Sequence, residues 1–561
     1  MISRRSLLRC SLAATAAGAV GWGCSPVNRS RAVAGKLLGP SAALGHRLRD
    51  HSYPAPTETR QAGVVIAGAG ISGLAAAYAL RQAGVRDVLI VDALAAPGGN
   101  ASWGVNAVSA YPWGAHYVPL VRQDCAPVLE LFSDLGIIVD MDEPDSGSAA
   151  GAARPDAARP DAARPVYNEY FLSADPQERL WMYGRWQDGF VPTMGASARD
   201  EAQFTAFFGA TERMKHALGR DGKPAFAIPV DNSSADPEWR ELDRITFAEY
   251  LRREGFDSPR LLWYADYCCR DDYGAVAADV SAWAGLHYFA SRNGVAANAD
   301  ASSVVTWPEG NGHLARELAE RSGATFQGSS LVTQVERTGQ GVSVDYFDAR
   351  LGRSIRVNAR AAVVCLPRFV ATRVVRGPSI ESAADFTYSP WMVANLTLSA
   401  LPAGKGQPLA WDNVIYDSPL LGYVVATHQG LESQRSSTVI TYYWPLSEHA
   451  PAVSRQSALA RSLSDWQAIV LRDLLRVHPE LEHHIENMDV WVWGHGMVRP
   501  TPGFIWGEAR RAASAGHLPP IYFAHSDLSG ISIFEEAYCR GRAAGELAAR
   551  DVGPSSAAVG I

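Results

Sequence analysis

A glycine-rich turn between a strand and a helix constrains the fold of this chain more than any other feature. The apolar run 64–67 leads into a turn that carries Gly68, Gly70, Ser72 and Gly73, and a strongly helix-forming segment follows. Glycines at this spacing permit a tight turn, a close approach of the backbone to a pyrophosphate and close packing of helix on strand. The free N–H groups of the helix N-terminus favour the phosphates. The pattern predicts a dinucleotide site in a βαβ unit.

The residues after the next strand indicate which dinucleotide is bound. Asp92 ends the apolar strand 88–91, where its carboxylate is placed to accept hydrogen bonds from an adenosine ribose. Gly98, Gly99 and Asn100 follow within a few residues. A second glycine pair at this place lets a loop pass close to the same pyrophosphate, which favours FAD over NAD.

With this second glycine pair the chain resembles the flavin amine oxidase superfamily, which includes spermidine dehydrogenase-like enzymes and phytoene desaturases. In that family the glycine pair is followed by a segment that lies along the isoalloxazine ring. Trp113, Gly114, Ala115 and His116 match this segment in residue type. The resemblance therefore implies a contact between these residues and the flavin.

The resemblance returns near the end of the chain. The run 521–525 reads as a buried strand, a turn follows, and the segment from Phe534 is rich in helix formers. In the family this unit brings an acid, here Asp527, to the ribityl-phosphate side of the flavin. It also aims a helix N-terminus at the pyrimidine ring, and the resemblance adds Gly530 and Ile531 to the expected cofactor contacts. No cysteine lies in the turn, so we expect non-covalent FAD.

A third match lies between these two. The segment 307–312 precedes a helical stretch, strands are expected at 331–335 and 342–346, and the apolar run 361–367 completes the set. In related flavoproteins these pieces complete the FAD domain. A residue near Val332 or Val335 would contact the adenine through its backbone.

Together these matches predict an α/β fold in which a Rossmann-like FAD-binding domain, of the flavin amine oxidase and glutathione reductase type, is interleaved with an α+β substrate domain. The Ala-Arg-Pro-Asp-Ala repeat predicts a low-complexity insert rather than a folded element. The expected FAD-binding segments are 61–145, 296–375 and 491–553. The expected remainder is a signal peptide at 1–24, a loosely ordered tether at 25–60, the insert at 146–165, and substrate-domain segments at 166–295 and 376–490.

The N-terminus resembles a twin-arginine export signal. Arg4 and Arg5 precede a short apolar stretch, 12–20, which is too short to span a bilayer. Cys24 is either a lipidation site or part of an ordinary cleavage region, and the sequence leaves both open. We therefore expect a periplasmic or otherwise exported protein, with membrane attachment only through a lipid anchor at Cys24.

Charge and cysteine content exclude several functions. A net charge of -7 over 561 residues gives no basis for a nucleic-acid partner. The seven cysteines show neither a disulfide framework nor the spacing of a metal site, so structural roles are expected for the five beyond the targeting segment and no metal is expected.

Three residues are the candidates for chemistry at the flavin. Trp493 and His495 lie in a segment that resembles the one before the last FAD motif of spermidine dehydrogenase-like proteins, and His116 lies in the segment expected along the ring. Core packing remains an alternative for each. Asp271 or Asp272 is placed to bind an amine, although a helix-end cap is the simpler interpretation.

The resemblance implies an exported FAD-dependent oxidoreductase that removes a hydride from an amine C–N bond, or a related C–H bond, to flavin N5. Many family members carry a lysine on a strand of the substrate sheet, but the matching stretch 389–398 has none. A quinone or a cytochrome is therefore favoured over oxygen as the electron acceptor. Two alternatives remain: a desaturase or isomerase of an isoprenoid or lipid, and a non-catalytic FAD-binding surface protein.

Overall fold

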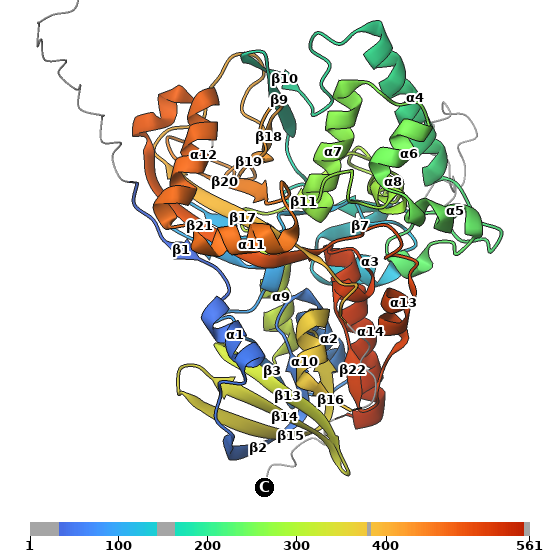
Figure 1. The fold of residues 1–561 in the computed structure, drawn as a ribbon, viewed down its shortest axis with the longest axis vertical. Helices are drawn as coiled ribbons and strands as arrows, with labels where there is room; N and C mark the ends of the chain where they lie inside the picture. Colours follow the sequence, from blue (N-terminus) through green and yellow to red (C-terminus); the bar gives the residue numbers. More distant parts are fainter. Residues whose placement is uncertain (1–32, 143–162, 378–382, 433, 555–561) are drawn as a thin grey trace, which may run out of the picture.

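The computed structural model describes residues 33–142, 163–377, 383–432 and 434–554. Two eight-stranded sheets organise these residues, one in the lower and one in the upper half of the molecule in Figure 1. Helices pack against both sheets, and the chain passes between the two halves several times. The predicted α/β class, with a parallel Rossmann-like sheet and a second α+β unit interleaved with it, is confirmed.

The first sheet contains the glycine-rich turn. Its central strands are parallel, and the apolar run that precedes the turn is fully buried, as expected for parallel strands covered on both faces. The strand β22 (Ile521–Phe523) pairs with β15 beside this core. In order across the sheet the other strands are β12 (Thr325–Gln327), β3 (Val88–Val91), β2 (Pro56–Ala67), β15 (Arg353–Val364), β14 (Gly341–Asp348), β13 (Ser330–Thr338) and β16 (Val375–Arg376).

Three helices pack beside this sheet, and the first of them contacts both of the others. They are α2 (Ile71–Gln82), α9 (Gly312–Ser322) and α14 (Phe534–Val552). Further helices of this half are α1 (Ala42–Asp50), α3 (Ala126–Asp134), α10 (Arg368–Val374) and α13 (Glu508–Ala515). The chain thus builds one domain from its beginning, its middle and its end.

The second sheet presents a different core on each face. Along β17 (Tyr388–Leu398), Met392 and Ala394 pack with the helices α11 (Pro451–Ala460) and α12 (Leu463–Val477), whereas Trp391 and Val393 pack with aromatic residues of the first domain. The other strands, in order, are β1 (Leu37–Leu38), β21 (Ile485–Val498), then β17, β20 (Thr438–Pro445), β19 (Gly422–Val425), β18 (Asp412–Ile415), β9 (Glu178–Met182) and β10 (Arg185–Asp188).

A helical layer stands beside the second sheet, on the right in Figure 1. It consists of α4 (Ala198–Lys215), α5 (Pro237–Glu241), α6 (Phe247–Arg253), α7 (Pro259–Tyr273) and α8 (Ala282–Ala290). The remaining strands form short two-stranded sheets: β4 (Trp103–Val105) with β5 (Ala110–Pro112), β6 (Tyr117–Pro119) with β11 (Val304–Thr306), and β7 (Ile138–Asp142) with β8 (Arg164–Tyr167).

Two segments differ from their predicted domains. Residues 33–60 are not a loose tether, because β1 pairs with β21, Leu48 of α1 is buried, and β2 begins at Pro56. The strand β21 places residues 491–498 in the second sheet rather than in the FAD-binding domain. Edge pairing of this kind depends on residues far apart in the chain, so a local pattern does not reveal it.

Other predictions fall on residues that are not described. The twin-arginine segment with Cys24 and most of the insert, 146–162, lie outside the described residues. Among the described residues, no helix combines the length and the apolar character that crossing a bilayer requires.

Candidate functional site

The glycine-rich turn forms a cradle of backbone groups at the end of β2. Gly68 has φ of +103°, and Gly70 caps α2 without a side-chain hydrogen bond, so the helix begins with open N–H groups. The N–H of Gly98 donates to the carbonyl of Ala69 at 2.9 Å. A Cβ on Gly99 would lie 2.9 Å from the Cα of Gly70. The two glycine pairs therefore face each other at a distance that only glycine permits, and the cradle fits a pyrophosphate.

Asp92 holds this turn in place. Its Oδ2 accepts the backbone N–H of Ala69 at 2.6 Å, and its Oδ1 accepts that of Leu94 at 2.7 Å. Burial raises the pKa of Asp92 above its ordinary value. Each carboxylate oxygen has a further lone pair, so the position fits a ribose hydroxyl as well, and the predicted ribose contact stays a prediction.

The segment predicted to lie along the flavin packs on the second glycine pair. The N–H of Ala115 donates to the carbonyl of Asn100 at 3.0 Å, and a Cβ on Gly114 would lie 2.2 Å from that same oxygen. The Asn100 side chain donates in turn to the carbonyl of Gly496 on β21. Asn100 thus joins the dinucleotide loop, this segment and the second sheet.

Trp493 supports the same segment from the other side. Its Nε1 donates to the carbonyl of Trp113 at 2.6 Å, and its ring lies 5.2 Å from that of Trp491. Trp113 itself lies 5.3 Å from Trp491. Trp493 is 7% exposed, which gives it a positioning role for the backbone of Trp113.

His116 faces the second sheet. Its ring stacks on Tyr443 at 4.8 Å and lies 5.5 Å from Trp411. Burial lowers the pKa of His116 to about 4, so the imidazole is neutral at pH 7. Its Nε2 is buried and has no hydrogen-bond partner among the described residues. A bound group could supply that partner, which suits the predicted contact with flavin or substrate.

His495 has different ring partners from those of His116, namely Phe369 and Tyr388. The pairing of β17 with β21 shifts register between Ser389 and Trp391, and this irregularity separates His495 from the regular alternation of the strand. Its ring is exposed and stacks on Phe369 at 4.4 Å. The structure therefore does not bring the three predicted catalytic residues together.

Asp527 is enclosed in a network. Its Oδ2 accepts the Tyr388 hydroxyl at 2.5 Å and the backbone N–H of Arg368 at 2.8 Å, and its Oδ1 lies 3.0 Å from Nδ1 of His525. Burial alone would raise the pKa of Asp527, but His525 and Tyr388 hold it below its ordinary value. The carboxylate orders the turn before α14, and its contact with FAD stays a prediction.

The remaining predicted cofactor residues lie near the same edge of the first sheet or within it. Ser72 is buried in the first turn of α2, and Gly530 has φ of +83°. Ile531 is fully buried, as is Val335, which lies on β13 between β14 and β16. The contacts of these residues with the cofactor also stay predictions.

Three carboxylates meet near His116, and we call them the carboxylate cluster: Glu178, Asp271 and Asp412. Glu178 and Asp412 are direct partners in the parallel pair of β9 and β18, so their side chains point to the same face. Asp271 lies in the last turn of α7. The structure thus joins acids from three segments that are far apart in the chain.

The cluster shifts the titration of its own members. Protein surrounds the Glu178 carboxyl on most sides although the residue keeps solvent access, and burial followed by the charge of Asp271 raises the pKa of Glu178 to about 7. Burial and the charge of Asp272 raise the pKa of Asp271 to about 7. Burial, Asp271 and Glu178 raise the pKa of Asp412 well above its ordinary value. Close like charges of this kind favour a bound cation.

Nearby arginines are engaged elsewhere. Arg292 forms an ion pair with Asp272, and its guanidinium lies 4.1 Å from the Tyr288 ring. Arg270 pairs with Asp266 at 3.1 Å. Within the described part of the chain, no ion pair involves a member of the carboxylate cluster, so a cationic ligand would be its first close partner.

Aromatic side chains surround the carboxylate cluster, and we call them the aromatic shell: Tyr117, Tyr264, Tyr267, Trp411 and Tyr443. The charges of Asp412 and Asp271 raise the pKa of Tyr267 and of Tyr443, so both rings lie within electrostatic range of the cluster. The Tyr443 hydroxyl donates to the carbonyl of Gly114 at 3.0 Å. The shell therefore links the carboxylate cluster to the segment predicted to lie along the flavin.

Sequence reasoning found the cradle but missed most of this second part. Asp271 was a candidate for amine binding, whereas Glu178 and Asp412 carry no motif, since each is a single acid at the start of a strand. The one available signal was the high aromatic content of residues 166–295.

Comparisons with known proteins agree with this architecture. A model of the NAD(P)-binding Rossmann-like domain matches residues 66–135. No curated protein matches the chain in sequence. Three similar solved structures are a triple mutant of putrescine oxidase with redesigned cofactor binding, cyclohexylamine oxidase from Brevibacterium oxydans, and a fatty acid isomerase from P. acnes.

The similarity to these structures extends over almost their full length. Putrescine oxidase shares 17% identity at a TM-score of 0.61, over 88% of this chain and 100% of the other. Cyclohexylamine oxidase shares 16% at 0.57, over 88% and 99%. The isomerase shares 15% at 0.56, over 87% and 98%. The chain therefore has the fold of these proteins, two of which are amine oxidases by name.

Proposed function

We propose that this protein is an FAD-dependent oxidoreductase that oxidises a cationic amine at a C–N bond. The observation that carries the proposal is the carboxylate cluster inside the aromatic shell, one ring contact away from His116. Negative charge and aromatic faces in one place are the two features that hold an alkylammonium group. The raised pKa values leave the carboxylate cluster only partly ionised at pH 7, and a bound ammonium would favour ionisation of its members. Three acids can accommodate more than one ammonium group, so di- and polyamines are the favoured substrates.

The residues of the dinucleotide cradle fit FAD. The approach of Gly99 to Gly70 leaves room for phosphate oxygens and excludes a side chain, and the open N-terminus of α2 favours their charge. When bound, FAD supplies the two-electron acceptor for the hydride that leaves the carbon beside the substrate nitrogen.

The side chains of the site hold and orient the substrate. The carboxylate cluster binds an ammonium group, and Tyr443 and Trp411 offer ring faces beside it. His116, which is neutral at pH 7, presents the unpartnered Nε2 to a polar atom of the ligand. Positioning of the substrate in this way is most of what a flavin reaction requires from the protein.

Two structural neighbours are named for amines, putrescine and cyclohexylamine, and one for fatty acid isomerisation. All three share only the fold with this chain. The cluster favours the amine among them because an apolar acyl chain offers no charge to three carboxylates. Desaturation or isomerisation of a lipid is the alternative reaction that an experiment must distinguish from amine oxidation.

The proposal also includes the electron acceptor and the cellular location of the protein. The strand β17 carries no lysine, which supports a quinone or a cytochrome as electron acceptor in place of oxygen. The arginine pair near the N-terminus supports export to the periplasm, and Cys24 supports an optional lipid anchor.

An anaerobic flavin-bleaching screen tests this proposal. The purified, FAD-loaded chain is mixed with putrescine, spermidine, cyclohexylamine, a fatty acid and an isoprenoid while flavin absorbance is followed. We expect bleaching by the amines, with rapid recovery after a quinone is added and slow recovery in air. Bleaching or product formation only with the fatty acid or isoprenoid would contradict the amine assignment. Full flavin content without bleaching by any donor would support a non-catalytic role.

A further inference from the structure

Two cysteines that are far apart in the chain meet in the structure. The sulfur atoms of Cys125 and Cys539 lie 4.0 Å apart across a sequence separation of 414 residues. Cys125 is the N-cap residue of α3, and Cys539 lies on α14. Contacts between α3 and α14 bring these two positions together at the edge of the dinucleotide domain.

We propose that Cys125 and Cys539 form an oxidisable dithiol that closes to a disulfide and ties α3 to α14. The sulfurs must approach by about 2 Å to reach a bond of about 2.05 Å. Rotation about χ1 supplies most of such a shift. The Cys125 side chain makes no capping hydrogen bond with α3, so its rotation breaks no contact at the helix end.

No other cysteine pair in the described part of the chain has this arrangement. Cys268 and Cys269 are neighbours on α7, where adjacent side chains point in directions about 100° apart. Cys365 is buried at the end of β15. A structural role was expected for all five cysteines from the sequence. Of the described cysteines, only Cys125 and Cys539 are placed so that their sulfur atoms can react with each other.

The exposure of the two thiols sets the order of the reaction. Cys539 is partly exposed, whereas Cys125 is 1% exposed. With a small disulfide oxidant such as oxidised glutathione, the Cys539 thiolate attacks one sulfur and releases one glutathione thiol. Cys125 then attacks the mixed disulfide and releases the second glutathione thiol. The two thiol protons are lost to solvent and end on the two released thiols, and two electrons pass to the oxidant.

The thiol pair is slow to react at neutral pH. The hydrogen bond with Cys125, together with burial, raises the pKa of Cys539 well above its ordinary value. Only a small fraction of the thiol is ionised at pH 7, so oxidation of the folded chain accelerates as the pH rises. Burial of the sulfur atoms and the high pKa of the Cys539 thiol would also slow reduction of the disulfide.

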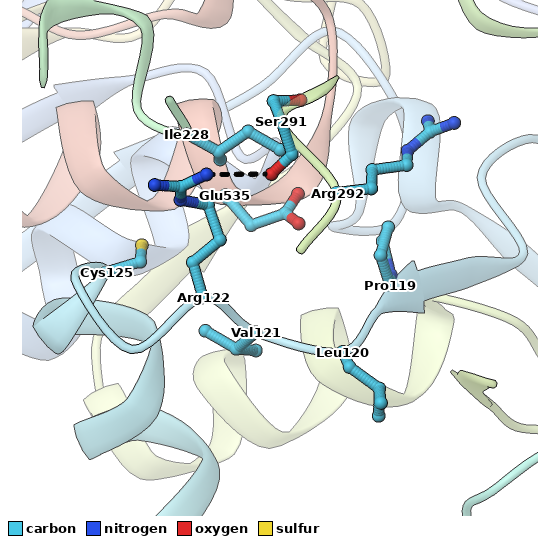
Figure 2. A pocket seen from close by; sticks show the side chains of 9 residues that line it. All are labelled: Pro119, Leu120, Val121, Arg122, Cys125, Ile228, Ser291, Arg292 and Glu535. Atoms are coloured by element: carbon cyan, nitrogen blue, oxygen red, sulfur yellow. Dashed lines mark hydrogen bonds between the residues drawn. The ribbon is translucent and has the colours of Figure 1, made fainter. Parts of the chain in front are cut away.

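The proposed disulfide would form beside a small pocket. Figure 2 shows Cys125 on its wall with Arg122, Ser291, Arg292 and Glu535, around space for about one water molecule. Glu535 lies one helical turn before Cys539 on α14. A bond here links the first and last blocks of the dinucleotide domain and closes a very long loop, the case in which a cross-link constrains the unfolded chain most.

Thiol counting and peptide mapping on the full chain test the inference. The folded protein is incubated with oxidised glutathione at pH 8.5, then denatured and alkylated. We expect two fewer free thiols than in the reduced protein, and a disulfide between the tryptic peptides that contain Cys125 and Cys539. The melting temperature should rise by at least about 2 °C and return to its starting value with a reductant.

Two variants complete the test. Cys539→Ala should lose no thiol pair and show no reductant-dependent melting shift, whereas Cys365→Ala should behave as the wild type does. An unchanged thiol count in the oxidised wild type, or a link between Cys125 and any other cysteine, would overturn the inference. Mapping of the wild type decides this even if a variant does not fold.

Discussion

At the scale of single residues, two glycines with similar backbone strain differ in what surrounds them. Gly99 has φ of +56° and its Cβ position lies 2.9 Å from Gly70, whereas Gly136 has φ of +68° and nothing within 4 Å. Gly99→Ala should therefore displace the dinucleotide cradle and lower the FAD content of the purified protein at least about tenfold, since loss of one phosphate contact costs about 1.5–3 kcal/mol.

Gly136→Ala is the matched control for this prediction. It carries the same cost of a side chain in the left-handed region, about 1–2 kcal/mol, without a clash. Flavin absorbance per protein, measured after dialysis, should remain at the wild-type value in this variant. Equal flavin loss in both variants would mean that strain, rather than the close approach of the two glycine pairs, explains the effect.

The carboxylate cluster gives a pH-dependent prediction. The folded-state pKa of Glu178 is raised to about 7 from an ordinary value of 4.5. The unfolded chain therefore releases this proton first, and the destabilising contribution is absent below about pH 4.5 and complete above about pH 7. Glu178→Gln removes it, so the variant should melt about 2 °C above the wild type at pH 8, a small value because Glu178 keeps solvent access.

Thermal unfolding of the ligand-free protein at pH 5 and pH 8 checks the sign. The two proteins should differ little at pH 5 and separate at pH 8. Glu482→Gln, which changes an exposed acid outside the cluster, should show no separation at either pH. A Glu178→Gln variant that is less stable at pH 8 would show that Glu178 has a stabilising partner.

At the scale of single elements, the contact between α14 and α2 depends on small residues. A Cβ on Gly541 would lie 2.1 Å from the carbonyl of Ser72, and one on Gly545 would lie 2.5 Å from that of Ala76. The backbone of α14 therefore lies directly on α2 just behind the dinucleotide cradle. Gly541→Ala should destabilise the protein by about 1–3 kcal/mol through overpacking, although alanine is the better helix former.

A second helical glycine serves as the control. Gly209 lies within α4, and its nearest neighbour is the end of the Arg213 side chain at 3.7 Å. Gly209→Ala should stabilise the protein by about 0.5–1 kcal/mol. Denaturant unfolding of both variants should give changes of opposite sign, and stabilisation by Gly541→Ala would contradict the close helix contact.

Helices and strands could be predicted where the sequence pattern is local. Prediction failed where a strand pairs with a segment far away in the chain. The strands β13 and β14 and the helix α14 lie where the sequence predicted them, whereas β15 begins eight residues before the apolar run 361–367. The pairing of β1 with β21 was not predictable, because two residues at a sheet edge carry no periodic signal. The irregular pairing of β17 with β21 beside His495 was likewise not predictable, and the role of His495 stays a prediction.

At the scale of the whole molecule, the site exists only where the two sheets meet. The first sheet supplies the dinucleotide cradle, and the second supplies Tyr443 and Asp412. Asp271 lies on α7 in the helical layer. The glycine pattern is contiguous in sequence, and so the cofactor half could be predicted. The carboxylate cluster joins positions 178, 271 and 412, and that proximity follows only from the three-dimensional fold.

The central claim is that this surface recognises the charge of an amine next to a bound flavin. The most direct measurement is anaerobic flavin reduction by putrescine and by butylamine, which have the same number of carbons but differ by one amino group. It is made for the wild type, Glu178→Gln and Glu482→Gln at pH 8. We expect half-saturation at a concentration at least about tenfold lower for putrescine in the wild type, a difference of about 1.4 kcal/mol.

Comparison of the two variants should distinguish a loss of charge recognition from general damage to the protein. Glu178→Gln should lose most of the preference for putrescine, and Glu482→Gln should retain it. The account is contradicted if butylamine is equally effective in the wild type, or if a fully FAD-loaded protein is reduced by neither amine.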